Sequence, residues 1–135
     1  MLNLDTKIVK NFVIRIFFAN FAGKITIKML KFISFGSGSS GNCYYLYTET
    51  DSLLIDVGVG IRTLKKHFHN YGLRFEDVHH ILITHDHADH VKSVGSLSTD
   101  YHLPVYATRK VHAGIERNYC VRKKIVPNHA HIIEK

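Results

Sequence analysis

The sequence has little cysteine and no long apolar run. Its 135 residues include only Cys43 and Cys120, which are too few for a disulfide framework and lack the spacing of a structural zinc site. We therefore predict a reduced, cytoplasmic setting. No segment reaches the roughly 18 consecutive apolar residues that a membrane span needs. Residues 12–22 are apolar, but Arg15 interrupts them and no clean small-residue cleavage site follows, which argues against a signal peptide.

The positive charge is concentrated near the N-terminus. The formal net charge is +7, and residues 1–28 hold five basic side chains against one acidic side chain, a net of +4. The other 107 residues hold 13 basic and 10 acidic side chains, so the body of the protein is only mildly basic. Such a surface tolerates an anionic substrate without demonstrating nucleic-acid binding. The strongest basic run, Arg122-Lys123-Lys124, is interpreted as a solvated surface segment.

Apolar patterning predicts strands that alternate with helices. Helical spacing predicts a helix over residues 61–71 closed by Gly72, one that starts near Asp89, and one over 108–118 capped by Thr108. The tail over residues 121–133 is predicted to start as a strand. The order of elements, without an internal repeat, indicates one α/β layered domain. The other predicted strands cover residues 31–35, 43–48, 53–57, 78–84 and 104–107.

A cluster of histidines carries the candidate chemistry. Five of the 11 histidines fall between residues 79 and 90, and the strongest pattern is His85-x-His87-x-Asp89-His90 after a predicted strand. His85 and His87 can share one metal, while Asp89 and His90, at the start of a helix, can hold a second. Imidazole nitrogen and carboxylate oxygen suit zinc, and manganese or iron would accept the same ligands. A solvated, histidine-rich loop is the alternative interpretation.

Two metal ions would explain why these residue types occur together. A metal ion lowers the pKa of bound water from about 15.7 to about 7. Two ions about 3.5–4 Å apart can share one hydroxide and also hold a substrate oxygen. The pattern therefore predicts two divalent cations and hydrolysis at neutral pH by a metal-bound hydroxide. It assigns Asp89 a catalytic role in addition to its role as a ligand.

This pattern resembles the metallo-β-lactamase-fold hydrolases. Their H-x-H-x-D-H motif is matched at every fixed position by the four residues above. Asp56 follows an apolar run and matches an aspartate that the family places after an upstream strand. The resemblance implies that Asp56 orients the metal-binding loop without binding the metal itself. It also implies a four-layer αββα sandwich, of which this chain supplies the N-terminal half as a mixed sheet with flanking helices.

Residues 29–42 are similar to the opening of the bacterial WalJ/YycJ-like branch of this family, in the sequence Met-Leu-Lys-Phe-Ile-Ser-Phe-Gly-Ser-Gly-Ser-Ser-Gly-Asn. The similarity covers about residues 29–120. Members of that branch are described as phosphodiester-cleaving, with exonuclease-like activity, so the resemblance implies DNA or another phosphodiester as substrate. Ser39, Ser40 and Asn42 could form a phosphate cradle. Without a Gly-Lys-Ser/Thr sequence, a plain hairpin loop is the preferred interpretation.

The chain departs from the family after the motif. The family completes its site with a histidine, a bridging aspartate and a last histidine from later strands, whereas Asp100 follows the motif too closely to be the bridging residue. We expect residues 1–28 to be an N-terminal extension, with Met29 as an alternative start, and residues 29–135 to be the N-terminal part of the domain. Six other histidines are interpreted as structural or surface residues: His79, His80, His102, His112, His129 and His131.

An incomplete site leaves other functions open. A half domain would expose one apolar sheet face, through which association is expected. Two protein ligands per metal are fewer than the three of a catalytic zinc site, so a catalytically inert fragment is one alternative. Thioester or lactam hydrolysis by the same fold is another, because substrate choice depends on regions outside the motif.

Overall fold

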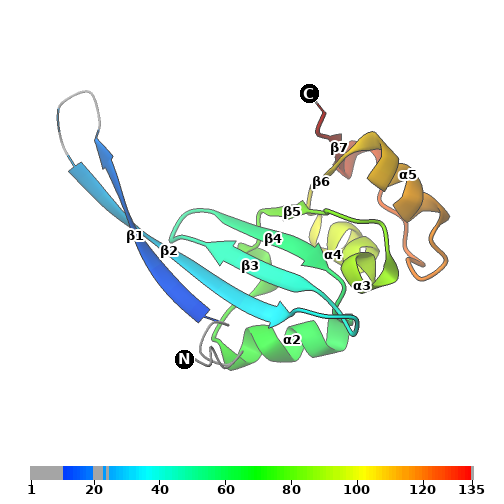
Figure 1. The fold of residues 1–135 in the computed structure, drawn as a ribbon, viewed down its shortest axis with the longest axis horizontal. Coiled ribbons are helices and arrows are strands. Elements are labelled where there is room, and N and C mark those ends of the chain that lie inside the picture. The colour runs from blue at the N-terminus through cyan, green and yellow to red at the C-terminus, as the bar shows by residue number, and fades with distance from the viewer. Residues whose placement is uncertain (1–10, 20–22, 24, 135) are drawn as a thin grey trace, which may run out of the picture.

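The computed structural model describes residues 11–19, 23 and 25–134, and its strands form one mixed sheet (Figure 1). Seven strands lie side by side in chain order. Neighbours from β1 to β4 are antiparallel, and neighbours from β4 to β7 are parallel. The strands are β1 (Asn11–Ala19), β2 (Ile25–Gly36), β3 (Cys43–Tyr47), β4 (Ser52–Val57), β5 (His80–Leu82), β6 (Val105–Ala107) and β7 (Ala130–Ile132).

Helical crossovers account for the parallel half of the sheet, because parallel neighbours cannot be joined by a tight turn. Helix α2 follows β4, α3 and α4 follow β5, and α5 follows β6. The predicted N-cap of α5 is confirmed, since the Thr108 side chain accepts a hydrogen bond from the backbone N–H of Val111 at 3.2 Å. The helices are α2 (Ile61–Asn70), α3 (Ala88–Val91), α4 (Val94–Tyr101) and α5 (Arg109–Arg117), with 3₁₀ turns η1 (Phe75–Asp77) and η2 (Pro127–His129).

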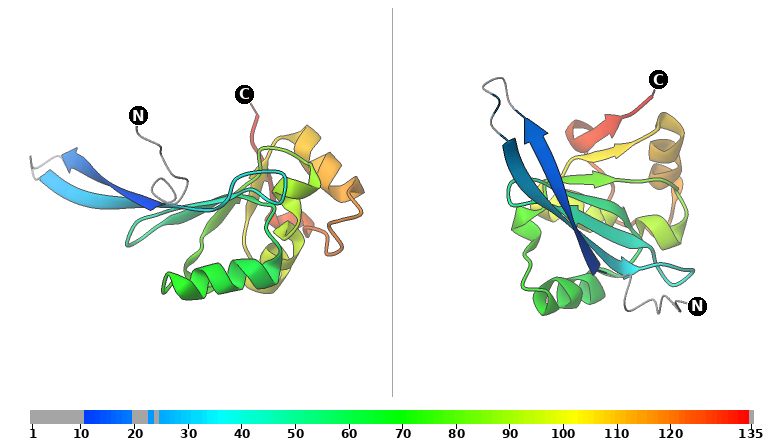
Figure 2. Two further views of the ribbon diagram at one scale, coloured as in Figure 1. Left: turned by 60° about the horizontal axis from the view of Figure 1, so that its bottom comes forward. Right: turned by 60° about the vertical axis from the view of Figure 1, so that its left-hand side comes forward.

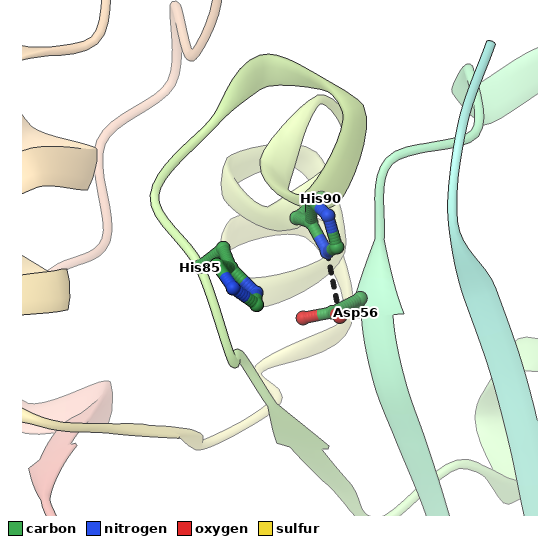
Figure 3. Close-up of side chains that lie close together, drawn as sticks. All are labelled: Asp56, His85 and His90. Atoms are coloured by element: carbon green, nitrogen blue, oxygen red, sulfur yellow. Dashed lines mark hydrogen bonds and ion pairs between the residues drawn. The ribbon is translucent and has the colours of Figure 1, made fainter. Parts of the chain in front are cut away.

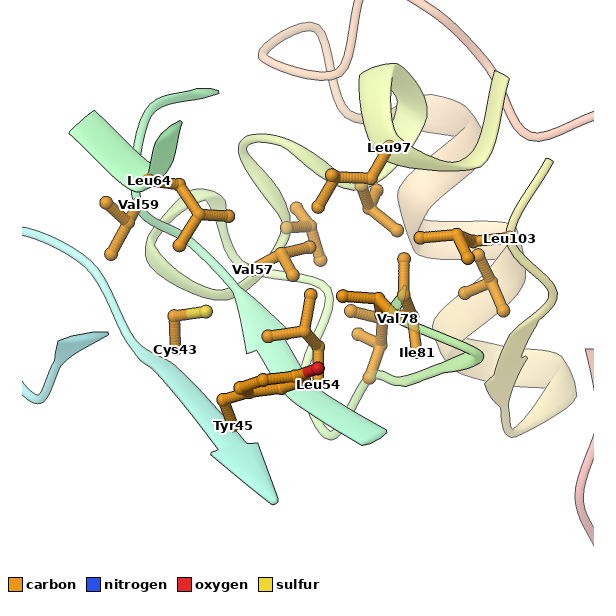
Figure 4. Packing of buried hydrophobic residues seen from close by; sticks show 14 of the residues in the cluster. Cys43, Tyr45, Leu54, Val57, Val59, Leu64, Val78, Ile81, Leu97 and Leu103 are labelled. Atoms are coloured by element: carbon orange, nitrogen blue, oxygen red, sulfur yellow. The ribbon is translucent and has the colours of Figure 1, made fainter. Parts of the chain in front are cut away.

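The core lies between the helices and one face of the sheet (Figures 2 and 4). Because strand side chains alternate between faces, one residue in two along the buried part of the sheet, from Ile33 on β2 to Val105 on β6, points to the helices. The helices meet this row with apolar side chains such as Leu64, Phe68 and Leu97. The predicted α/β class, a mixed sheet with flanking helices, is therefore confirmed. The paired, buried row across the sheet is Ile33, Tyr45, Leu54, Ile81 and Val105.

The opposite face of the sheet is apolar but only half-buried. Phe32 pairs with Leu46, Leu46 with Leu53, and Leu53 with His80, so these four residues share one row. Among the described residues, the helices that supply the core lie on the other side of the sheet (Figure 2). Association through this open face stays a prediction.

Two predicted elements differ from the structure in extent. The strand predicted over 78–84 is confined to His80–Leu82. The helix predicted from Asp89 divides into α3 and α4, because the Ser93 N–H donates to the Val57 carbonyl at 2.9 Å instead of continuing the helix. Within residues 11–19, 23 and 25–134, no helix is long and apolar enough to cross a membrane.

The prediction that the tail starts as a strand at residue 121 is wrong. Val121 is buried in the core outside any strand, and β7 begins only at Ala130. Pro127 opens the 3₁₀ turn before β7, and a proline cannot donate to a strand ladder. At the other end, β2 starts at Ile25 and so crosses the expected boundary between residues 28 and 29. The alternative start at Met29 stays a prediction, and residues 1–10 lie outside the described residues.

Candidate metal centre

The candidate site lies where β4 and β5 end, at the edge where parallel strands commonly deliver functional side chains. Asp56 is the penultimate residue of β4, His85 lies in the loop after β5, and His90 lies on α3. One ligand atom from each of these three residues lies within 4.8 Å of the others (Figure 3). Residues that are 34 positions apart in the sequence therefore meet at one point.

Asp56 is the anchor of this site. It is 3% exposed, and its backbone adopts φ 61°, a left-handed conformation that aspartate tolerates better than most side chains. Its carboxylate accepts hydrogen bonds from the Thr84 N–H at 2.8 Å, the Thr84 hydroxyl at 2.6 Å and Nδ1 of His90 at 2.8 Å. Asp56 thus ties the start of the histidine loop to α3.

The hydrogen bonds of Thr84 and Asp56 assign the protonated nitrogen of two histidines. The single hydroxyl proton of Thr84 goes to Asp56, because a carboxylate cannot donate. The 2.9 Å contact between Thr84 Oγ1 and His85 Nδ1 is then a hydrogen bond donated by His85. His90 likewise donates from Nδ1 to Asp56. In the neutral state, both rings therefore keep the lone pair on Nε2, the arrangement that a metal-binding histidine needs.

The Asp89 carboxylate lies near the ring of His90. One of its carboxylate oxygens is 3.9 Å from His90 Nε2. The side-chain nitrogen of Asn42 is 3.4 Å from Asp89 Oδ2 and 3.4 Å from His90 Nε2. The sequence pattern indicated only a hairpin loop or a phosphate cradle at Asn42. No spacing rule would have predicted its contact with Asp89 and His90, which are 47 and 48 positions away.

His87 is held less closely than the other motif residues. Its side chain is 76% exposed, and its Nε2 lies 3.9 Å from Asp86. Its ring centroid is 6.2 Å from that of His85, whereas the His85 and His90 ring centroids are 4.7 Å apart. Among the described residues, the compact cluster is therefore Asp56, His85 and His90, with Asp89 next to it and His87 on its exposed side.

Close backbone packing fixes the histidine loop from two sides. A Cβ on Gly58 would overlap the Asp89 carbonyl, and a Cβ on Gly114 would overlap the Asp86 side chain. The side-chain amide of Asn118 donates to the Asp86 carbonyl at 2.9 Å. These two glycines and Asn118 hold the loop without metal-binding atoms of their own. No sequence pattern distinguishes these two glycines, because a glycine needed for close approach looks like any other glycine.

The six histidines interpreted above as structural or surface residues lie outside this cluster. Nδ1 of His79 lies 3.3 Å from Asp51 Oδ1, and Nδ1 of His80 lies 3.6 Å from the same oxygen. The ring of His102 packs 6.0 Å from that of His129, and His112 Nε2 contacts the His131 carbonyl at 2.8 Å. The structure thus offers each of them a contact other than the candidate centre.

The basic run is partly committed to local contacts. Lys123 pairs with Asp100 at 3.0 Å. Lys124 donates to the Asn118 carbonyl at 2.8 Å and to the Ile115 carbonyl at 3.4 Å, at the end of α5. Two of the three cations therefore satisfy the protein itself, which weakens the case for this run as a nucleic-acid surface.

Solved structures with the same arrangement define the fold. The metallo-β-lactamase SMB-1 bound to 2-mercaptoethanesulfonate matches with a TM-score of 0.60 and 14% identity over 78% of this chain and 44% of that chain. The β-lactamase from Chitinophaga pinensis matches with a TM-score of 0.59 and 22% identity over 78% of this chain and 43% of that chain. The chain therefore has the metallo-β-lactamase fold in part, as the motif implied.

A family model and curated relatives narrow the assignment. The model described as "Anti-Pycsar protein Apyc1" matches residues 31–117, and the chain belongs to this family. Exodeoxyribonuclease YycJ of Bacillus anthracis is 40% identical over 64% of this chain and 33% of its own length. Exodeoxyribonuclease WalJ of Streptococcus pneumoniae serotype 2 (strain D39 / NCTC 7466) is 35% identical over 77% of this chain and 38% of its own length. The WalJ/YycJ resemblance is confirmed, and the chain spans about a third of these relatives.

Proposed function

We propose that this chain carries part of the catalytic centre of a metal-dependent hydrolase that cleaves phosphodiester bonds in DNA. The proposal is supported by the names of its relatives, both exodeoxyribonucleases. The observation that carries it is the Asp56–Thr84 network, which leaves Nε2 of both His85 and His90 as a lone-pair donor. Two imidazole nitrogens and nearby carboxylates form a donor set that fits zinc, with manganese as an alternative.

Each motif residue has a role in this proposal. His85 and His87 hold one divalent ion, and Asp89 and His90 hold a second. Such ions, when bound, lower the pKa of water and polarise a phosphoryl oxygen. Asp89, next to His90 Nε2 at 3.9 Å, is the catalytic carboxylate. Asp56 stays outside the ligand set, because its two oxygens already accept three hydrogen bonds, and it fixes the ring orientation of His90.

Two alternatives remain as outcomes of the test. The β-lactamase structures share at most 22% identity with this chain among those compared above, so they support the fold and not a lactam substrate. A catalytically inert chain would follow if two ligands per ion bind too weakly to retain metal.

The test measures metal binding and DNA cleavage on the same preparations. Zinc and manganese are titrated by calorimetry into the unsubstituted chain, His85→Ala and the matched control His79→Ala. We expect His85→Ala to lower metal affinity by about 10–100-fold or more and to abolish cleavage of end-labelled linear DNA. His79→Ala should change neither quantity, because His79 faces Asp51.

Failure can take distinguishable forms. No metal uptake by the unsubstituted chain would contradict the metal centre itself. Metal uptake without DNA cleavage would contradict the nuclease activity of this chain. Hydrolysis of a chromogenic cephalosporin in place of DNA would replace the phosphodiester proposal with lactam hydrolysis.

A further inference from the structure

Asn42 connects three segments of the candidate metal centre. Its backbone N–H donates to the Asp89 carbonyl at 2.8 Å, and its own carbonyl accepts from the Gly58 N–H at 2.9 Å. Its side-chain oxygen accepts from the Gly38 N–H at 3.1 Å. Its side-chain nitrogen donates to the Gly38 carbonyl at 2.9 Å and to the Asp89 carbonyl at 3.2 Å. One residue thus links the serine-rich loop, the loop after β4 and helix α3.

The same side-chain nitrogen faces the atoms proposed to bind metal. It lies 3.4 Å from Asp89 Oδ2 and 3.4 Å from His90 Nε2. A carboxamide nitrogen carries two protons, and its two shorter contacts are with the backbone carbonyls of Gly38 and Asp89. Those carbonyls are not ligand atoms, so a cation on Asp89 Oδ2 and His90 Nε2 would leave both contacts intact.

We infer that Asn42 is a positioning residue for the second metal ion: it fixes the backbone of Asp89 so that the Asp89 carboxylate and His90 Nε2 face one point. This inference rests on the proposed function. Asparagine suits the position because it supplies one acceptor and two donors together. Alanine would remove the side-chain bonds to both polar backbone groups of Gly38 and to the Asp89 carbonyl, and would leave Asp89 held by the backbone N–H of residue 42 alone.

The first measurement needs no metal. Amide hydrogen exchange is followed by NMR in the metal-free chain for Asn42→Ala and for the matched control Asn70→Ala. Asn70 is the exposed last residue of α2. We expect exchange of the residue 42 amide, which donates to the Asp89 carbonyl, and of the His90 amide, which donates to the His87 carbonyl, to rise by about tenfold or more in Asn42→Ala. Asn70→Ala should exchange at the unsubstituted rate.

The second measurement is zinc affinity, by competition with a chromogenic chelator. We expect Asn42→Ala to bind zinc about 10–100-fold more weakly than the unsubstituted chain, the usual effect of removing a group that orients a ligand. If the unsubstituted chain binds zinc and Asn42→Ala stays within about twofold of it, the inference is overturned, even when stability falls. Such a result would make Asn42 a residue that only stabilises the fold.

Asn42→Ala could fail to fold, and the unsubstituted chain could fail to bind zinc. Should Asn42→Ala not fold, Asn42→Gln keeps the carboxamide but displaces it by one methylene, and the same affinity criterion applies to it. Should the unsubstituted chain bind no zinc, the proposed function fails. In that case the metal-positioning role of Asn42 is overturned with it, and the exchange rates of the residue 42 and His90 amides show only whether Asn42 holds the backbone of Asp89.

Discussion

The two faces of the sheet are built from the same strands but are stabilised differently. On the helix-covered face, Leu54 and its neighbours Tyr45 and Ile81 are at most 2% exposed. On the open face, the adjacent residues Leu46 and Leu53 are only half-buried. Asp56 lies two residues after Leu54, where the pairing of β3 with β4 has a bulge and the backbone is left-handed, and its carboxylate is buried at the candidate site. The site is therefore anchored at the end of the strand that carries Leu54.

The largest expected effect separates the two faces directly. Leu54→Ala should lower the free energy of unfolding by roughly 2–5 kcal/mol, because it leaves a cavity in a closely packed core. Leu53→Ala, one position along the same strand, should cost less than about 1.5 kcal/mol, because its side chain is already partly in water. Urea unfolding of both variants checks the difference. Equal losses would show that the open face is as tightly packed as the covered one.

Asp56 extends the comparison from packing to the site. Asp56→Ala should lower the free energy of unfolding by about 2–3 kcal/mol, because it leaves the Thr84 and His90 donors without their acceptor. The matched control is Asp51→Ala, since Asp51 is exposed and should contribute little. Thermal and urea unfolding, together with the His90 ring signals, measure the effect. A loss no greater than that of Asp51→Ala would contradict the role of Asp56 as an anchor.

Much of this organisation was predictable from the sequence, for reasons that differ between elements. The strand with Leu54 and Asp56, the helix with Leu64 and Phe68, and the histidine motif all depend on local periodicity or spacing. The contacts made by Asn42 and Gly58 depend on the approach of segments far apart in the sequence, for which local pattern carries no signal. The tail failed as a strand prediction because burial of Val121 in the core, outside any strand, outweighed its β propensity.

The smallest effect concerns the two cysteines, which differ in burial. Cys43 is buried, and burial, with a further contribution from Asp56, raises the pKa of its thiol well above the usual range. Because the thiolate is the reactive form, iodoacetamide at about pH 8 should label Cys120, which is partly exposed, before Cys43. Mass spectrometry of the labelled peptides measures this order, and both cysteines should react in urea. Fast labelling of Cys43 in the folded chain would contradict its burial.

The raised pKa of Cys43 also has a consequence for stability. Below the pKa that the Cys43 thiol has in the unfolded chain, the thiol is protonated in both the folded and the unfolded chain. Its contribution to the stability of the folded chain is then fully present. As pH rises, the unfolded thiol ionises first, so stability should fall in the alkaline range.

The fold leaves a lone pair on Nε2 of both His85 and His90, where a metal ion would bind. The most direct test is the long-range proton–nitrogen NMR spectrum of the imidazole rings in the metal-free chain, followed by zinc addition. We predict protons on Nδ1 of both rings and a shift of both Nε2 signals when zinc is added. Protons on Nε2 of both rings, with no response to zinc, would contradict it.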